Sequence, residues 1–138
     1  MIDRGRLPVL VVDDYQAMRR TIRTVLIQIG FSNIDFAEDG ATALAKLRNG
    51  SYRLIISDLK MQPMSGLGLL REVRLDERLR NVPFIMVTAA SDVEKVVAAR
   101  EAGVSDYIVK PFTMDVLSKK IAGLVGLPSG GPFRPAAE

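Results

Sequence analysis

The chain contains no cysteine and no histidine among its 138 residues. The first absence excludes disulfides and thiolate metal sites. The second excludes histidine-based acid–base catalysis, zinc sites built on histidine, and any phosphohistidine carried by the chain itself. A metal bound here would therefore be a hard cation on oxygen ligands, with Mg²⁺ and Mn²⁺ as the candidates.

Aromatic residues are scarce, at 6% of the chain, and no apolar run reaches membrane-spanning length. The segment from Met1 to Pro8 lacks the apolar core of a signal peptide, so we expect a cytoplasmic location. The net charge is only +3, and the basic residues are scattered rather than interleaved with aromatics. This distribution is typical of solvated helix faces and argues against nucleic-acid or membrane binding.

Five strand-like segments alternate with five helix-like segments in a chain that is 48% apolar and long enough for one domain. Apolar runs predict strands at residues 7–12, 33–37, 53–57, 83–87 and 106–109. Apolar residues at helical spacing, with capping signals, predict helices at residues 15–29, 40–48, 67–75, 91–102 and 114–125. This alternation indicates parallel βαβ units with right-handed crossovers.

Several residues are placed to begin or end these helices. Gly30 and Gly103 follow the first and fourth helices directly. The sequence Ser91-Asp-Val-Glu94 has the pattern of a capping box that opens the fourth helix, and Thr113 is expected to cap the last. We predict one domain over residues 6–126, followed by a flexible tail rich in proline and glycine at 127–138.

Charged residues end three of the apolar strands. Asp13 and Asp14 follow the first strand, Asp58 follows the third, and Lys110 follows the fifth. Because the carboxyl ends of parallel strands meet at one edge of a sheet, where ligands bind in open α/β folds, we expect these side chains to converge. Three neighbouring carboxylates repel one another, so at least one pKa should rise unless a cation lies among them.

A bound Mg²⁺ ion would neutralise this repulsion, and Mg²⁺ prefers one or two carboxylates together with phosphate oxygens as ligands. We assign Asp13 and Asp14 to the metal, Asp58 to a shared role as ligand and nucleophile, and the backbone carbonyl of Lys60 to a further ligand. A nucleophilic carboxylate forms an aspartyl phosphate. Mg²⁺ and Lys110 are then able to neutralise the incoming phosphoryl oxygens.

Two further residues are candidates for a switch. Thr88 ends the fourth strand, where its hydroxyl can donate to a phosphoryl oxygen on Asp58. Tyr107, in the fifth strand, can exchange buried and exposed rotamers as Thr88 moves. Taken alone, each residue is equally consistent with ordinary strand packing.

The combination of these motifs closely resembles the receiver domain of bacterial response regulators, and within that family the stand-alone chemotaxis type. The resemblance covers about residues 6–126 and rests on several motifs: Val11-Val-Asp13-Asp14 with Met18-Arg19-Arg20, Ala37-Glu38-Asp39-Gly40, Ile56-Ser57-Asp58, Met64-Ser-Gly66, Val87-Thr88-Ala89 and Lys110-Pro111-Phe112-Thr113. It implies a flavodoxin-like α/β fold, with five parallel strands in the order 2-1-3-4-5 and helices on both faces.

The resemblance also implies a function. The chain would be a Mg²⁺-dependent phospho-acceptor in a two-component system, with a histidine kinase or phosphotransfer protein as donor to Asp58. It would not be an enzyme beyond its own phosphorylation and slow dephosphorylation. Thr88 and Lys110 would sense the phosphoryl group, and Tyr107 would couple the site to a surface for a downstream protein target. The Lys110–Pro111 bond is expected to be cis.

One departure from the family and three rival functions are also visible in the sequence. In Met61-Gln-Pro63-Met64 the proline comes one place later than the family pattern, which bears on the loop that carries the Lys60 carbonyl. The rivals are an unphosphorylated receiver-like scaffold, a Mg²⁺-dependent phosphohydrolase, and a flavin binder. The adjacent acids Asp13-Asp14 differ from the Asp-x-Asp of such hydrolases, and the loop after them lacks donors for a flavin phosphate.

Overall fold

The computed structural model describes residues 7–124, apart from the side chain of Val93. The strands are β1 (Val9–Val12), β2 (Ile34–Ala37), β3 (Leu54–Asp58), β4 (Phe84–Ala89) and β5 (Asp106–Lys110). The helices are α1 (Gln16–Gln28), α2 (Gly40–Asn49), α3 (Gly66–Leu75), the 3₁₀ helix η2 (Ala90–Lys95), α4 (Val96–Glu101) and α5 (Met114–Leu124). The predicted domain ends at residues 6 and 126, and the predicted tail 127–138, lie outside the described residues.

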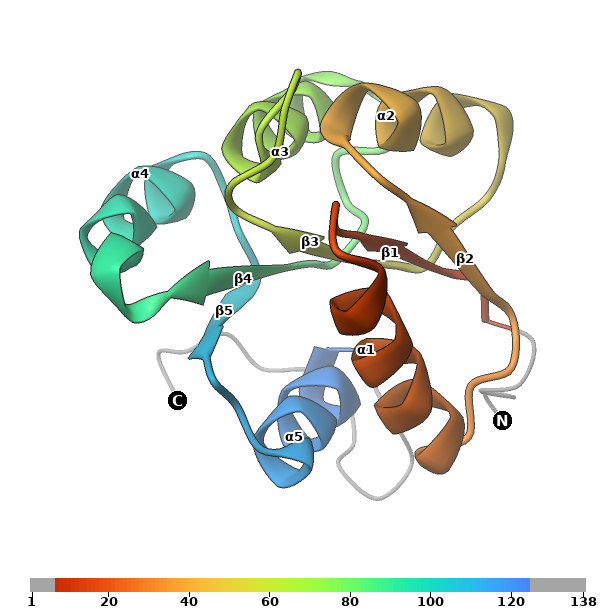
Figure 1. Ribbon diagram of the computed structural model, residues 1–138. Helices are drawn as coiled ribbons and strands as arrows, with labels where there is room; N and C mark the ends of the chain where they lie inside the picture. The colour runs from red at the N-terminus through yellow and green to blue at the C-terminus, as the bar shows by residue number, and fades with distance from the viewer. Residues whose placement is uncertain (1–6, 125–138) are drawn as a thin grey trace.

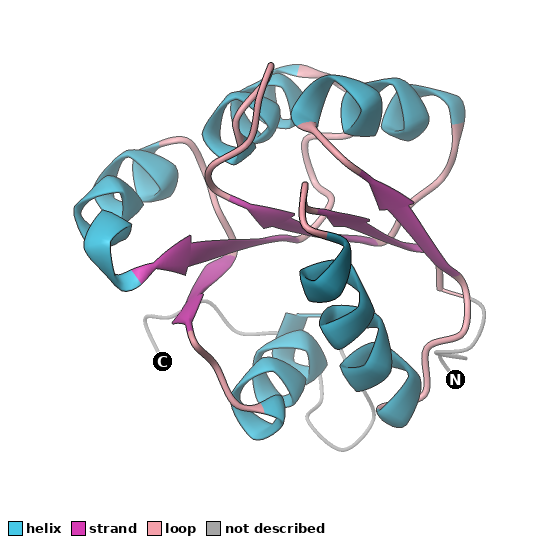
Figure 2. Cartoon of the chain, in the orientation of Figure 1, coloured by secondary structure: helices cyan, strands magenta, loops and turns pink. Residues whose placement is uncertain are grey.

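The five strands form one parallel sheet in the order β2-β1-β3-β4-β5, which confirms the predicted fold class. Helices α2 and α3 cover one face, and α1 and α5 cover the other (Figures 1 and 2). In the register, Val12 of β1 lies opposite Ser57 of β3, and Ala89 of β4 lies opposite Lys110 of β5. The residues that follow β1 therefore lie beside the end of β3.

A separate apolar core fills each side of the sheet. The alternating residues of β1 divide between them, with Leu10 and Val12 in one core and Val9 and Val11 in the other. Because helices cover both faces, all four of these residues are buried, as the continuous apolar run predicted. The two cores pack the strands on both faces, so the backbone at their carboxyl ends is held at one edge of the sheet.

Three of the predicted helix ends are confirmed. Gly30 and Gly103 follow α1 and α4 with φ of 108° and 95°, a left-handed conformation that favours glycine. The Thr113 hydroxyl oxygen accepts a hydrogen bond from the Val116 amide at 3.1 Å, which caps α5. Within residues 7–124, no helix combines the length and the apolar character that crossing a bilayer requires.

The predicted capping box at Ser91–Glu94 is wrong. This segment lies inside η2, and α4 begins later, at Val96, after an N-cap residue that makes no side-chain cap hydrogen bond. The reason is a tertiary contact: the Asp92 carboxylate, 8% exposed, pairs with Lys60 at 3.2 Å and with Lys95 at 3.5 Å. Lys60, in the loop after β3, thus holds the Asp92 carboxylate. This tertiary contact competes with the local sequence pattern that favours a regular α-helical turn at Ser91–Glu94.

Arg74 joins α3 to the segment that follows it, at residues 80–82, and to the turn before β5, at residues 103–105. Its Nε donates to the Gly103 carbonyl at 2.8 Å, and its Nη1 donates to the carbonyls of Arg80 at 3.0 Å and Val82 at 2.7 Å. Nη2 approaches the Ser105 hydroxyl at 3.4 Å. Burial lowers the pKa of this guanidinium from its usual value, which indicates partial desolvation of the charge.

We expect Arg74→Met to lower the free energy of unfolding by about 2 kcal/mol, because hydrogen bonds to a charged donor contribute more than neutral ones and several carbonyls lose their partner together. Urea unfolding followed by circular dichroism measures this. Arg71→Met is the matched control, since Arg71 is exposed on the same helix. An equal loss in both variants would contradict the role given to Arg74.

Candidate functional site

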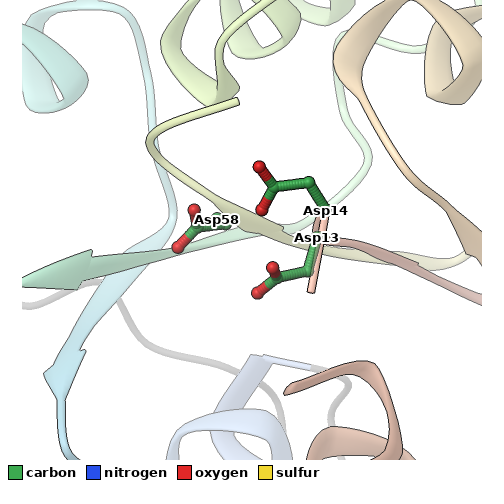
Figure 3. A group of neighbouring side chains, drawn as sticks. All are labelled: Asp13, Asp14 and Asp58. Carbon is green, nitrogen blue, oxygen red and sulfur yellow. The ribbon is translucent and has the colours of Figure 1, made fainter. Parts of the chain in front are cut away.

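The three acids predicted to converge do so. Asp13 and Asp14 follow β1, and Asp58 is the last residue of β3. Each offers a carboxylate oxygen within 4.8 Å of the others, and Figure 3 shows them at the adjacent ends of the two strands. Their proximity follows from the parallel pairing of β1 with β3, which brings both carboxyl ends to one edge of the sheet.

Asp13 is the most deeply buried of the three, at 1% exposed. Its Oδ1 accepts a hydrogen bond from the Tyr15 amide at 2.9 Å, whereas its Oδ2 is buried without a partner among the described residues. A buried carboxylate oxygen without a donor is costly unless a cation approaches it. The donor set and the unpartnered oxygen both fit a hard divalent cation such as Mg²⁺.

Burial raises the pKa of Asp13 from 3.8 to about 6. The Tyr15 amide and the Lys110 ammonium oppose this rise, while the charges of Asp58 and Asp14 add to it. The predicted rise in pKa is therefore present, but its main cause is desolvation and not the repulsion from which it was predicted. Without a cation, the folded protein holds an unfavourable negative charge at this position above about pH 6.

Lys110 reaches the same site from β5. Its ammonium Nζ lies 2.6 Å from Asp58 Oδ1, with the two side chains 25% and 9% exposed. The peptide bond between Lys110 and Pro111 is cis, as predicted. The candidate nucleophile thus has a cation on one side and two carboxylates on the other.

The loop between β3 and α3 packs tightly against the end of β3 because of Gly66. The Gly66 amide donates to the Leu59 carbonyl at 2.9 Å. A Cβ at this position would collide with the Asp58 carbonyl oxygen and approach the Met86 sulfur at 2.9 Å. Only glycine permits this approach, so the Met64-Ser-Gly66 motif supports the backbone of Asp58. The Gln62–Pro63 bond in this loop is also cis.

Lys60 lies in this loop, two residues beyond Asp58. Its exposed side chain turns to Asp92 at 3.2 Å, which ties the β3–α3 loop to η2. Lys60 also lines a shallow hollow with Asp14, Met61 and Gln62, on the side of the acid cluster. Its backbone carbonyl stays a predicted ligand.

Among the described residues, no hydrogen bond joins Thr88 or Tyr107 to Asp58. The buried Thr88 hydroxyl donates to the Ala89 carbonyl at 3.3 Å. The Tyr107 ring is half-buried, with Arg100 of α4 and Lys120 of α5 each 5.6 Å from its centroid. The Tyr107 ring therefore contacts side chains of both α4 and α5, and its role in a switch stays a prediction.

Two residues that contact the loops around the site, Asp92 and Arg19, were not identified from the sequence. Asp92 was interpreted only as part of a capping box, although it pairs with Lys60. Arg19 donates from Nη1 to the Asp13 carbonyl at 2.6 Å and so fixes the start of the β1–α1 loop. No spacing rule predicts either contact, because each joins residues through the tertiary structure.

Comparison with known proteins agrees with this geometry. The response regulator receiver domain family matches residues 9–122. The chain is 45% identical over 115 residues to the chemotaxis protein CheY of Pseudomonas aeruginosa, an alignment that covers 83% of this chain and 93% of that protein.

Solved structures show the same likeness. The chemotaxis response regulator CheY4 of Vibrio cholerae is 31% identical with a TM-score of 0.77, covering 83% of this chain and 95% of that one. A receiver domain of a sensor histidine kinase from Pseudomonas aeruginosa, solved with a magnesium ion coordinated in its active-site cleft, is 27% identical with a TM-score of 0.79. That alignment covers 87% of this chain and 98% of that one.

Proposed function

Because the chain belongs to the response regulator receiver domain family, we propose that it is a phospho-acceptor signalling switch that takes a phosphoryl group on Asp58. The observation that carries the proposal is the position of the Asp58 carboxylate, which lies 2.6 Å from the Lys110 ammonium and beside two further carboxylates. A nucleophile flanked by a cation and by a candidate metal site is the arrangement that phosphoryl transfer to a carboxylate needs.

The acid cluster is suited to Mg²⁺, with Asp13, Asp14 and Asp58 as carboxylate ligands and the Lys60 carbonyl as a further one. When bound, the ion neutralises charge on the phosphoryl oxygens and on the acids themselves. Asp13 Oδ2 supports this assignment, because it is a buried acceptor to which no group of residues 7–124 donates. Asp14 is exposed, so it leaves the cluster open to solvent and to an incoming donor.

In the proposed reaction, an Asp58 carboxylate oxygen attacks the phosphorus of a phosphohistidine on a donor protein. A P–O bond forms as the P–N bond breaks, and the imidazole leaves and takes up a proton from solvent. A phosphohistidine donor lies outside these 138 residues, since they contain no histidine. Histidine kinases and phosphotransfer proteins carry such a group, and we propose one of them as the partner.

Thr88, Lys110 and Tyr107 would transmit the effect of phosphorylation from Asp58 to the protein surface. Driving a two-state switch from 1:99 to 99:1 needs about 5.5 kcal/mol, and one hydroxyl hydrogen bond contributes about 1 kcal/mol. Thr88 alone is therefore too weak, and we propose that Lys110 moves from Asp58 to the phosphoryl group at the same time. Tyr107, between α4 and α5, would carry the change to a surface that binds a downstream protein in the cytoplasm.

The direct test is incubation with acetyl phosphate, a small acyl phosphodonor, followed by intact-protein mass spectrometry. We expect one phosphoryl group per chain in the presence of Mg²⁺ and almost none in excess EDTA. Addition independent of Mg²⁺ would contradict the metal role. No addition from acetyl phosphate or from a phosphorylated kinase would favour the scaffold alternative.

We expect Lys110→Met to bind Mg²⁺ more tightly, by a few-fold, and yet to take up phosphate at least tenfold more slowly. The ammonium competes with the metal for Asp58, so its removal frees the carboxylate, but the transferred group loses a cation that stabilises it. Calorimetric Mg²⁺ titration and phosphorylation rates measure the two effects. Lys119→Met, at an exposed position of α5, should leave both unchanged.

A further inference from the structure

A second hollow lies against α1, and its lining contains none of Asp13, Asp14 and Asp58. It has a volume of about 580 Å³ and is bounded by α1 and by the segment from β2 into α2. Its lining is rich in hydrogen-bond donors and contains Gln16, Arg19, Arg20, Arg23, Phe36, Ala37, Glu38, Thr42 and Lys46. Four of these side chains are cationic and one is acidic, so the hollow has a positive potential.

Two of the four cations already have partners in the fold. Arg19 donates to the Asp13 carbonyl at 2.6 Å. Lys46 pairs with Asp35 at 3.1 Å and donates to the Phe36 carbonyl at 2.7 Å. These contacts orient the two side chains, and the Asp35 carboxylate balances the charge of Lys46.

Arg20 and Arg23 differ, because no carboxylate among the described residues pairs with either guanidinium. Both residues are exposed, and they are three positions apart on α1, so their side chains leave the same face of the helix. Guanidinium groups bind phosphate with two parallel hydrogen bonds, a geometry that lysine lacks. The hollow therefore presents two exposed guanidiniums whose charge no carboxylate of residues 7–124 balances.

We propose that this groove between α1 and the β2–α2 segment binds a small anion that carries two or more phosphate groups. The volume lies within the range of small-molecule sites, and its concave form favours a compact ligand over a protein surface. Phe36 and Ala37 give the groove an apolar wall, which a sugar or base attached to the phosphates can contact. The site is separate from the proposed phosphorylation of Asp58 and does not depend on it.

The test is calorimetric titration of the whole protein with inorganic triphosphate and with ATP, in low salt and excess EDTA so that no metal bridges the ligand to the acid cluster. We expect saturable binding by the wild type and a loss of about tenfold or more in Arg20→Gln/Arg23→Gln. Tighter binding of ATP than of triphosphate would assign a contact to the nucleoside, and equal binding would assign recognition to the phosphates alone.

The matched control is Arg71→Gln/Arg80→Gln, which removes the same two charges from exposed positions outside the groove. It should bind both ligands within about twofold of the wild type, because screened charges at a distance contribute little. An equal loss in the control, or no saturable binding by the wild type, would overturn the proposal. Binding of a glutamate-rich peptide without binding of triphosphate would overturn it as well, in favour of a protein partner.

Discussion

Asp58→Asn should abolish phosphorylation from acetyl phosphate while leaving the fold intact. The amide cannot act as the nucleophile, yet it matches the carboxylate in shape and its oxygen can still accept from the Lys110 ammonium. Intact-protein mass spectrometry should find one added phosphoryl group on the wild type and none on the variant. The expected effect is complete loss, the largest that we predict for a single substitution.

Asp115→Asn is the control for this experiment. It makes the same chemical change at an exposed position of α5, where the carboxylate pairs with Lys119 at 3.1 Å. This variant should be phosphorylated like the wild type. Modification of Asp58→Asn to the same extent as the wild type would show that another residue takes the phosphoryl group, and the proposed acceptor would then be wrong.

Asp13→Asn should stabilise the metal-free protein at pH 8 and remove most of its stabilisation by Mg²⁺. The pKa of Asp13 is raised from 3.8 to about 6 in the folded state, mainly by burial. Because the folded state favours the protonated carboxyl, the stability that Asp13 contributes is fully present below about pH 4. It is lost as the pH rises through about 6 and the buried carboxyl ionises. A shift of this size corresponds to roughly 2–3 kcal/mol, and asparagine, which does not titrate, should recover that amount at pH 8 and almost nothing at pH 4.

Urea unfolding in EDTA at the two pH values measures this difference, and repetition with saturating Mg²⁺ measures the metal contribution. The wild type should gain stability from Mg²⁺ at pH 8 and much less at pH 5, where Asp13 is protonated. Asp14→Asn is the comparison, since it removes an exposed acid from the same cluster. It should weaken Mg²⁺ binding without the gain at pH 8, and a gain of equal size would assign the effect to general repulsion and not to burial.

These two expectations share a physical origin. The fold buries Asp13 with one oxygen that has no partner among the described residues, and it places carboxylate oxygens of Asp58 and Asp14 within 4.8 Å of an Asp13 oxygen. The metal-free protein is thereby destabilised at neutral pH, which is the condition that favours a divalent cation and a transferred phosphoryl group with its own counter-ions. The stability that the metal-free protein loses is thus linked to its affinity for the divalent cation.

The sequence by itself determined the order of strands and helices, the parallel sheet and the edge at which the acids meet. The reason is that buried parallel strands are continuous apolar runs, and Asp13, Asp14, Asp58 and Lys110 each come directly after such a run or end it. Once the strands are parallel neighbours, their ends have to lie together. The prediction that the bond before Pro111 is cis came from the family resemblance, because no local sequence pattern specifies this isomer.

Only the tertiary structure decided how these groups contact one another. It placed the Lys110 ammonium 2.6 Å from Asp58 and paired Asp92 with Lys60. It also buried Asp13 Oδ2 where no other group in the described part of the chain donates to it. Each of these depends on side chains from segments that are distant in sequence, packed around one backbone. Helix caps and strand ends follow from short-range geometry, whereas charge pairing and desolvation depend on every neighbour that the fold brings near.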